Sequence, residues 1–155
     1  MNSLGWNCRG LGNPRLVRAL HDLVRRWASK IVFLSETKLR TKSMERIRDR
    51  IGFANGLFVP SFDRSGGLAL LWTRETDLEI KSFGRFHIDA IITEANTNFK
   101  WRITGFYGHP QTHLRQFSWD LLAFLRDQYK LPWLCFGDFN EILSTDEKSS
   151  GLLRP

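Results

Sequence analysis

Polar residues that suit phosphate and metal chemistry stand at the ends of four apolar segments in this sequence. They are Asn7, Glu36, Tyr107 and the pair Asp138 and Asn140. A Mg²⁺ ion takes one or two carboxylates, keeps several waters and completes its shell with phosphate oxygens of a substrate. Another carboxylate can activate water, while amide and phenol groups can orient that water or donate to the phosphate. The residue types therefore point to phosphoester chemistry.

Each of these residues also has an ordinary structural explanation. Asn7 beside a glycine-rich turn can be a turn former, and Glu36 can be a loop or helix-entry acid. The segment Asp138-Phe139-Asn140 can be an Asx turn that closes a strand, and Tyr107 can belong partly to the core. The joint case is stronger, because every one of these residues follows an apolar run and strand ends are where sheets collect their sites. We therefore expect one cleft, with Tyr107 at its rim.

The elements that must position these residues begin with an alternation of strands and helices. A strand is expected at residues 2–7, and Pro14 opens a helix whose apolar residues recur at spacings of three and four. The run Lys30–Leu34 predicts a strand that is covered on both faces. A weaker helix is expected at about Ser43–Ile51. The apolar residues of the first helix are Leu16, Val17, Leu20, Leu23, Val24 and Trp27.

The middle of the chain is a series of strand-like segments. They fill residues 57–107, and the short turns between them predict antiparallel hairpins. A third helix is expected from about Thr112 to Tyr129, followed by an apolar strand at Trp133–Gly137. The pattern predicts a mixed sheet with helices outside it. The expected buried side of the third helix consists of Leu114, Phe117, Leu121, Phe124 and Leu125.

The basic charge of the chain is confined to its first third. Residues 1–50 hold 12 Lys and Arg against 4 Asp and Glu, a net charge of +8, whereas residues 51–155 have a net charge of −1. A polyanion such as nucleic acid would be drawn to this surface by release of its condensed counterions. The alternative is that these cations are only the solvated face of a helix, formed by Arg15, Arg18, Arg25 and Arg26.

Length and composition exclude several classes of protein. The 155 residues have the size of one domain, and 42% hydrophobic residues exclude a disordered or fibrous chain. No apolar stretch approaches the ~20 residues of a membrane span, and the N-terminus lacks the pattern of a signal peptide. Two cysteines are too few for a disulfide framework or a thiolate metal cage. We expect a soluble, reduced, intracellular domain, with the nucleus as one compartment and no identifiable protein partner.

Five ordered motifs carry a family resemblance that covers essentially the whole chain. The sequence resembles the endonuclease/exonuclease/phosphatase superfamily, and most of all the endonuclease domain of plant non-LTR retrotransposons. The implied fold is an α/β (α+β) four-layer αββα sandwich of the DNase I-like type, with the second sheet incomplete. The motifs are the segments Leu4–Gly12, Phe33–Lys38, Ser65–Trp72, Gly105–Gly108 and Gly137–Glu141.

The resemblance also implies a role for each candidate residue. Glu36 would be the principal ligand of Mg²⁺ or Mn²⁺, and Asn7 would support the metal and the catalytic centre. Tyr107 would touch the scissile phosphate, Asp138 would be the base, and Asn140 would help to position phosphate and nucleophile. The implied substrate is the DNA backbone.

Residues outside this set receive weaker assignments from the resemblance. Arg9 would join Tyr107 and Asn140 in contacting phosphate or DNA. The turn at residues 64–67 would be architecture and not catalysis. His109 matches no essential family role, and it can either approach a substrate backbone or be a structural loop histidine. Cys8 and His113 also match no essential family role.

The sequence departs from the family pattern at its C-terminal end. The family normally closes with a Ser-Asp-His motif, and this chain contains no Asp-His dipeptide. The resemblance therefore implies the N-terminal portion of an endonuclease domain, residues 1–155, with slow or absent cutting by this chain alone. Two alternatives stay open: a small-molecule or lipid phosphatase on the same fold, and a catalytically inactive basic module that binds nucleic acid or is inert.

Overall fold

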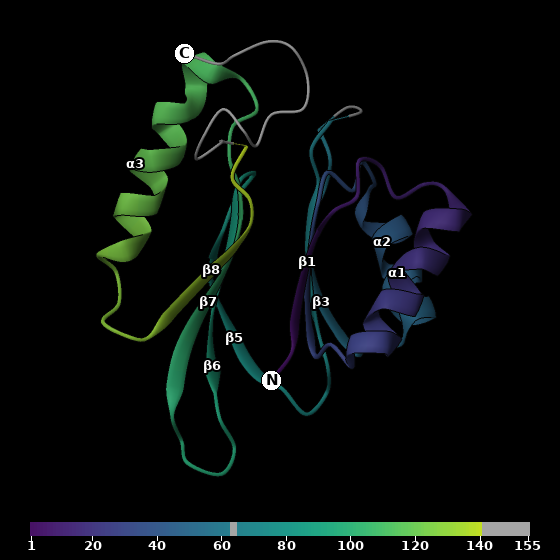
Figure 1. The fold of residues 1–155 in the computed structure, drawn as a ribbon, viewed down its shortest axis with the longest axis horizontal. Helices are drawn as coiled ribbons and strands as arrows, with labels where there is room; N and C mark the ends of the chain where they lie inside the picture. The colour runs from purple at the N-terminus through teal and green to yellow at the C-terminus, as the bar shows by residue number, and fades with distance from the viewer. Residues whose placement is uncertain (63–64, 141–155) are drawn as a thin grey trace.

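Two four-stranded sheets packed face to face form the centre of the computed structural model, which describes residues 1–62 and 65–140 (Figure 1). The first sheet has the strand order β1-β2-β4-β3 and consists of β1 (Ser3–Asn7), β2 (Ile31–Ser35), β3 (Asn55–Val59) and β4 (Leu68–Trp72). The second has the order β5-β6-β7-β8 and consists of β5 (Asp77–Phe83), β6 (His87–Thr93), β7 (Lys100–Tyr107) and β8 (Trp133–Asp138).

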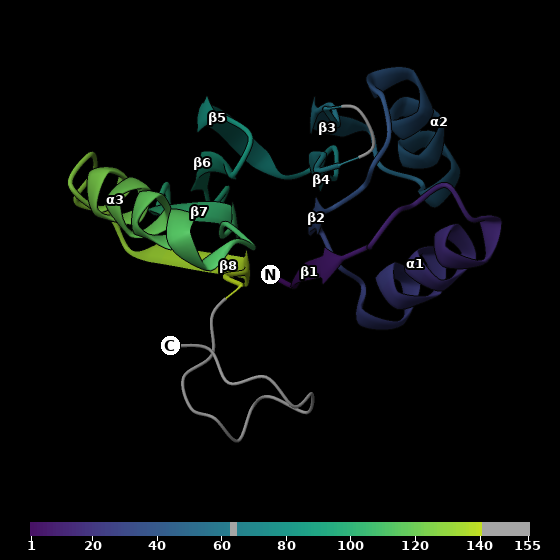
Figure 2. The ribbon, with the colours of Figure 1, turned by 90° about the horizontal axis from the view of Figure 1, so that it is seen from above.

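Helices cover the outer face of each sheet, so that the molecule has four layers (Figure 2). The first sheet carries α1 (Pro14–Trp27) and α2 (Thr41–Ile51), and the second carries α3 (Arg115–Arg126), which follows the short 3₁₀ turn η1 (Thr112–Leu114). This arrangement confirms the predicted four-layer mixed α/β sandwich. None of the helices in the described ranges is long and apolar enough to cross a membrane.

Local sequence signals account for the two helices on the first sheet. Asn13 caps α1, because its side-chain oxygen accepts a hydrogen bond from the backbone N–H of Arg15 at 2.9 Å, and Pro14 is the first helical residue as predicted. The helix α2 begins at Thr41, two residues before the expected start, and ends at Ile51, where Gly52 caps it with a φ of 88° that suits glycine.

The core lies in two layers, one under the helices and one between the sheets. Strand β2 is buried along its whole length and contributes alternate residues to the two layers, which confirms the prediction of a strand covered on both faces. Gly105 of β7 faces the ring of Phe33 in β2 so closely that a Cβ atom would overlap it. A glycine is therefore needed where the two sheets approach. The inter-sheet layer contains Ile31, Phe33, Leu68, Leu70, Ile88, Ala90, Ile92, Ile103 and Tyr107.

The buried side of α3 differs from the expectation. Phe117 and Phe124 were expected in the core, but their exposed fractions are 60% and 63%. The helix buries Leu125 as expected, together with Arg115 and Ser118, which were not among the expected residues. Hydrogen bonds select this side, because Ser118 Oγ accepts from the backbone N–H of His109 at 2.8 Å.

Candidate active site

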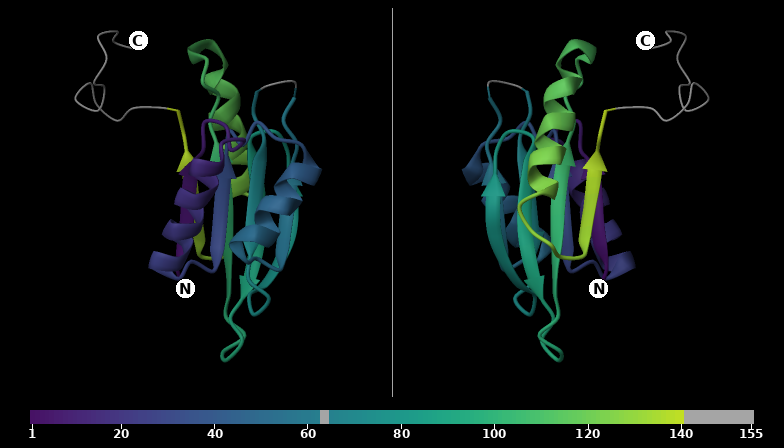
Figure 3. Two further views of the ribbon diagram at one scale, coloured as in Figure 1. Left: turned by 90° about the vertical axis from the view of Figure 1, so that its right-hand side faces the viewer. Right: turned by 90° about the vertical axis from the view of Figure 1, so that its left-hand side faces the viewer.

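The site lies where the parallel strand pairs of both sheets end (Figure 3). Strands β1 and β2 are parallel, with Asn7 opposite Ser35, and β7 and β8 are parallel, with Tyr107 opposite Asp138. The edge strands β1 and β8 lie against each other although they belong to different sheets. Parallel strands finish at the same edge of a sheet, so the polar residues after both pairs meet at one end of the sandwich.

A hydrogen bond between Asn7 and Asp138 joins the two sheets at this end. The side-chain Nδ2 of Asn7 donates to Asp138 Oδ2 at 2.7 Å, across 131 residues of sequence. The other oxygen of Asp138 accepts from the backbone N–H of Asn140 at 2.8 Å, and Asn140 Nδ2 donates to the carbonyl oxygen of Gly108 at 2.6 Å. Three of the predicted site residues therefore form one bonded group.

Glu36 and Tyr107 complete the cluster. Burial is the largest cause that raises the pKa of Tyr107 to about 12, and the negative charge of Glu36 is the next, with that of Asp138 a smaller one. The phenol is therefore protonated at neutral pH and can donate a hydrogen bond. Tyr107 is only 7% exposed, so it is buried and does not lie at the rim as expected. Burial and the charge of Glu36 also raise the pKa of the Cys8 thiol to about 12, which excludes a thiolate nucleophile there.

Left-handed backbone conformations gather around the same residues. Six non-glycine residues have positive φ in the described ranges, and four of them belong to the segments around the site: Arg9, Glu36, Lys38 and Asn140, with φ between 50° and 56°. This conformation is unfavourable for residues with a Cβ, and it persists where surrounding bonds enforce it. Here the backbone N–H of Gly10 donates to Glu36 O at 2.7 Å, and that of Lys38 donates to Gly66 O at 2.9 Å.

The oxygen donors of the cluster fit a hard cation held by few protein ligands. Within residues 1–62 and 65–140 no group of three or more His, Cys, Asp and Glu side chains could hold a metal ion. Mg²⁺ does not need such a group, because it keeps several waters and shares the rest of its shell with substrate phosphates. The half-buried carboxylate of Glu36 and the amide of Asn7 are chemically suited to that kind of site.

Arg9 stands beside this cluster with an exposed side chain. Its backbone N–H donates to Asn7 Oδ1 at 3.1 Å, so the residue helps to orient Asn7. A contact between its guanidinium group and phosphate stays a prediction.

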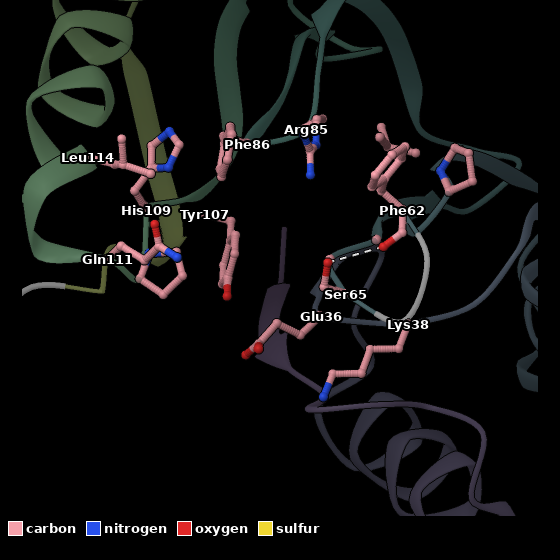
Figure 4. Close-up of a pocket in the computed structure, with 15 residues that line it drawn as sticks. Glu36, Lys38, Phe62, Ser65, Arg85, Phe86, Tyr107, His109, Gln111 and Leu114 are labelled. Atoms are coloured by element: carbon pink, nitrogen blue, oxygen red, sulfur yellow. Dashed lines mark hydrogen bonds between the residues drawn. The ribbon is translucent and has the colours of Figure 1, made fainter.

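A cavity of about 470 Å³ next to the cluster was missed by the sequence analysis (Figure 4). Arg85 and Phe86, from the turn between β5 and β6, line it together with Phe62 and Glu36. The sequence signal that could have indicated this cavity is an aromatic residue next to a cation in a short turn, because loops on a rigid scaffold are frequent binding elements. The turn before β4 also lines the cavity, although it was assigned to architecture alone.

The two mixed sheets, packed face to face between outer helices and with a polar cluster at one end, form a DNase I-like α/β sandwich. The chain belongs to the endonuclease/exonuclease/phosphatase family, because the model of that family matches residues 4–154. A comparison with curated proteins finds no significant match.

Solved structures with the same fold share little sequence identity with the chain. The human Nocturnin catalytic domain with bound sulfate anion has a TM-score of 0.68 and 16% identity, over 90% of this chain and 64% of that one. An AP endonuclease from Archaeoglobus fulgidus has a TM-score of 0.66 and 16% identity, over 96% and 60%. The 3′ phosphatase NExo (D146N) from Neisseria, bound to product DNA hairpin, has a TM-score of 0.63 and 15% identity, over 89% and 56%. The chain thus spans less than two thirds of each of these structures.

Proposed function

We propose that this chain is a divalent-metal-dependent phosphodiesterase that hydrolyses the backbone of DNA. The observation that carries the proposal is the 2.7 Å hydrogen bond from Asn7 to Asp138, which joins the ends of two sheets beside Glu36 and Tyr107. A carboxylate oriented by hydrogen bonds, a second carboxylate nearby and a protonated phenol together suit hydrolysis of a phosphoester.

Each member of the cluster has a defined task in this proposal. Asp138 accepts the proton of the attacking water, and its two oxygens are held in place by Asn7 and by the backbone N–H of Asn140. The water oxygen bonds to phosphorus as the bond from phosphorus to the leaving sugar oxygen breaks, and the leaving oxygen takes a proton from solvent. Tyr107 donates its phenol hydrogen to a non-bridging oxygen of the phosphate. Glu36 would hold the divalent cation, with support from Asn7. Mg²⁺ or Mn²⁺, when bound there, neutralises charge on the phosphate oxygens.

The distribution of charge favours a polymeric anion as the substrate. The first 50 residues carry a net charge of +8, and the side chains of Arg9 and Lys38 are exposed beside the cluster. The names of two similar structures, an AP endonuclease and a phosphatase bound to a DNA hairpin, support the same choice. The nucleus is a compartment in which the protein would meet such a substrate. The ordered motifs support an origin in a non-LTR retrotransposon, and reverse-transcriptase-like sequence downstream in the reading frame would test that origin.

Nicking of supercoiled plasmid by the purified chain tests the activity. We expect slow Mg²⁺- or Mn²⁺-dependent conversion to open circles, which EDTA stops and which Glu36→Gln removes. The matched control is Glu45→Gln on the exposed side of α2, which should cut like the wild type. Calorimetric titration with Mn²⁺ gives a readout that does not depend on turnover, and Glu36→Gln should weaken this binding at least about ten-fold.

Three results would contradict the proposal. Cutting that survives in Glu36→Gln or in EDTA would remove the metal role of that carboxylate. Hydrolysis of small phosphomonoesters without any cutting or binding of DNA would favour a phosphatase on the same fold. DNA binding without hydrolysis and without Mn²⁺ binding would instead identify an inactive basic module.

A further inference from the structure

The cavity beside the polar cluster has the properties of a ligand site. Its volume of about 470 Å³ lies in the range of small-molecule sites, and Glu36 and Tyr107 belong to its lining. The remaining walls come from both halves of the sandwich: the loop around Phe62 from the first sheet, and the β5–β6 turn with Phe86 from the second. A molecule held at the cluster could therefore extend into the cavity without a change of the backbone.

Aromatic rings form two opposing walls of this cavity. Phe86 is fixed, because its ring is parallel to that of Tyr107 within 2° and lies 3.8 Å from the ring of His109, measured between centroids. Phe62 lies across the cavity and is 67% exposed (Figure 4). Binding of a flat apolar ligand over an exposed phenylalanine at the mouth of a cavity is favourable, since it removes the ring from water.

Cations stand between and beside these rings. The side chain of Arg85 points into the cavity, and its guanidinium carbon lies 5.3 Å from the centroid of the Phe62 ring. Lys38 lines the opposite side, and among the lining residues that the structure describes Glu36 is the only acidic one. The cavity thus offers ring faces for a flat ligand and two positive charges for anionic groups attached to it.

We propose that this cavity binds one unpaired nucleotide of the substrate, next to the phosphate held at Glu36 and Tyr107, with its base against Phe86 and Phe62. The proposal rests on the phosphodiesterase function and deepens it by naming the substrate class. A base has two flat faces that stack on aromatic rings whatever its identity, and its flanking phosphates pair with Arg85 and Lys38. A base inside a duplex is already stacked on both faces, so it must leave the helix first. DNA with a single-stranded segment, gap or end is therefore preferred over continuous duplex.

Binding without cutting gives the direct test. The probes are a fluorescein-labelled single-stranded DNA 15-mer and the same sequence as a duplex, with anisotropy measured in EDTA. The variants Phe86→Leu and Phe62→Leu keep an apolar side chain and remove the ring face. We expect each to lower affinity for the single strand at least about five-fold, because stacking is worth ~1–3 kcal/mol per base, and to leave duplex binding unchanged. Phe99→Leu, at the 51% exposed residue before β7 at the other end of the sandwich, is the control.

An abasic series identifies the nucleotide that enters the cavity. Each base of the single strand is replaced in turn by an abasic site, and wild type and Phe86→Leu are compared. We expect one position at which the abasic substitution weakens wild type but leaves Phe86→Leu unchanged, which is the signature of a direct contact. Circular dichroism verifies that the variants are folded, and the exposed Phe62→Leu carries the same comparison if Phe86→Leu does not fold.

The outcomes separate this proposal from the function on which it rests. The cavity assignment alone would be overturned if both ring variants bound the single strand as tightly as the wild type, or lost equal affinity for single strand and duplex, while nicking still depended on Glu36. Absence of binding to both probes by the wild type would overturn both proposals together. A single abasic position that loses its effect in Phe86→Leu would establish the nucleotide site.

Discussion

A buried ion pair in the second sheet should control the position of the strand that carries Asp138. Arg102 of β7 and Asp89 of β6 are 1% and 0% exposed, and two bonds join them, Nε to Oδ1 at 2.8 Å and Nη2 to Oδ2 at 2.9 Å. Thr104 donates to the same carboxylate and accepts from the indole N–H of Trp133 in β8 at 2.8 Å. Replacement of Asp89 by Asn keeps the shape of the side chain and removes its charge.

The expected loss of stability arises because the buried Arg102 would be left without a counter-charge. Removal of one partner of a buried pair costs about 3–5 kcal/mol, because the remaining ion has lost its water and its partner. Arg102 keeps other contacts, since it donates to the carbonyl of Leu125 and lies 5.2 and 4.8 Å from the rings of Tyr129 and Trp133. These contacts favour the lower part of the range, so we expect Asp89→Asn to lower the free energy of unfolding by about 3–4 kcal/mol.

Urea unfolding and thermal melts measure this loss. For a chain of this size, a loss of that magnitude should lower Tm by about 10 °C. The matched control is Asp127→Asn, which removes the same charge from an exposed ion pair. In that pair the side chains of Arg126 and Asp127 are 67% and 73% exposed. That variant should change stability by less than about 1 kcal/mol. An effect of Asp89→Asn no larger than that of Asp127→Asn would refute the reasoning.

Three further perturbations test the site and its supports. Asn7→Ala removes the donor to Asp138 and should slow plasmid nicking at least about ten-fold, because a poorly oriented base loses much of its ~10²–10⁴-fold effect; nicking at the wild-type rate would argue against that role. Burial lowers the pKa of His87 below its ordinary value of 6.5, so the unfolded chain takes up a proton more readily and the free energy of unfolding should fall as the pH is lowered through 6.5; this slope should be smaller in His87→Gln, and equal slopes would contradict it. Gly105→Ala should destabilise the inter-sheet contact by about 1–3 kcal/mol, whereas Gly12→Ala, which meets only one atom at 4.0 Å, should be nearly neutral in the same melts.

The strands and the first helix could be predicted because their signals are local. The run at Lys30–Leu34 is continuous because β2 is covered on both faces, and the structure buries every residue of Ile31–Ser35. Asn13 and Pro14 mark the start of α1 through bonds within two residues. Interactions of this kind need no knowledge of distant parts of the chain.

The buried side of α3 could be predicted only in part, because distant residues decide it. Phe117 and Phe124 have helical spacing and are more apolar than Ser118, so periodicity places them beside Leu125 on the buried side. The structure buries Leu125 and Ser118 but exposes both phenylalanines, since the loop at His109 donates to Ser118 and the guanidinium group of Arg102 donates to the carbonyl of Leu125. Specific hydrogen bonds from another sheet strand and a loop outweigh two aromatic side chains here.

The turn-former explanation of two polar strand ends is confirmed, and it is compatible with the site roles proposed for the same residues. Asn7 accepts from the backbone N–H two residues later through Oδ1, and Asp138 does the same with the N–H of Asn140, so each makes an Asx turn. These local bonds occupy one side-chain atom and fix its rotamer, which leaves Nδ2 of Asn7 and Oδ2 of Asp138 to face each other. Each Asx turn thus orients its own side chain through a local bond, and packing of β1 against β8 brings the two side chains together. An Asx signal at the end of an apolar strand therefore supports a site assignment, because a side chain that works on a phosphate must first be held in place.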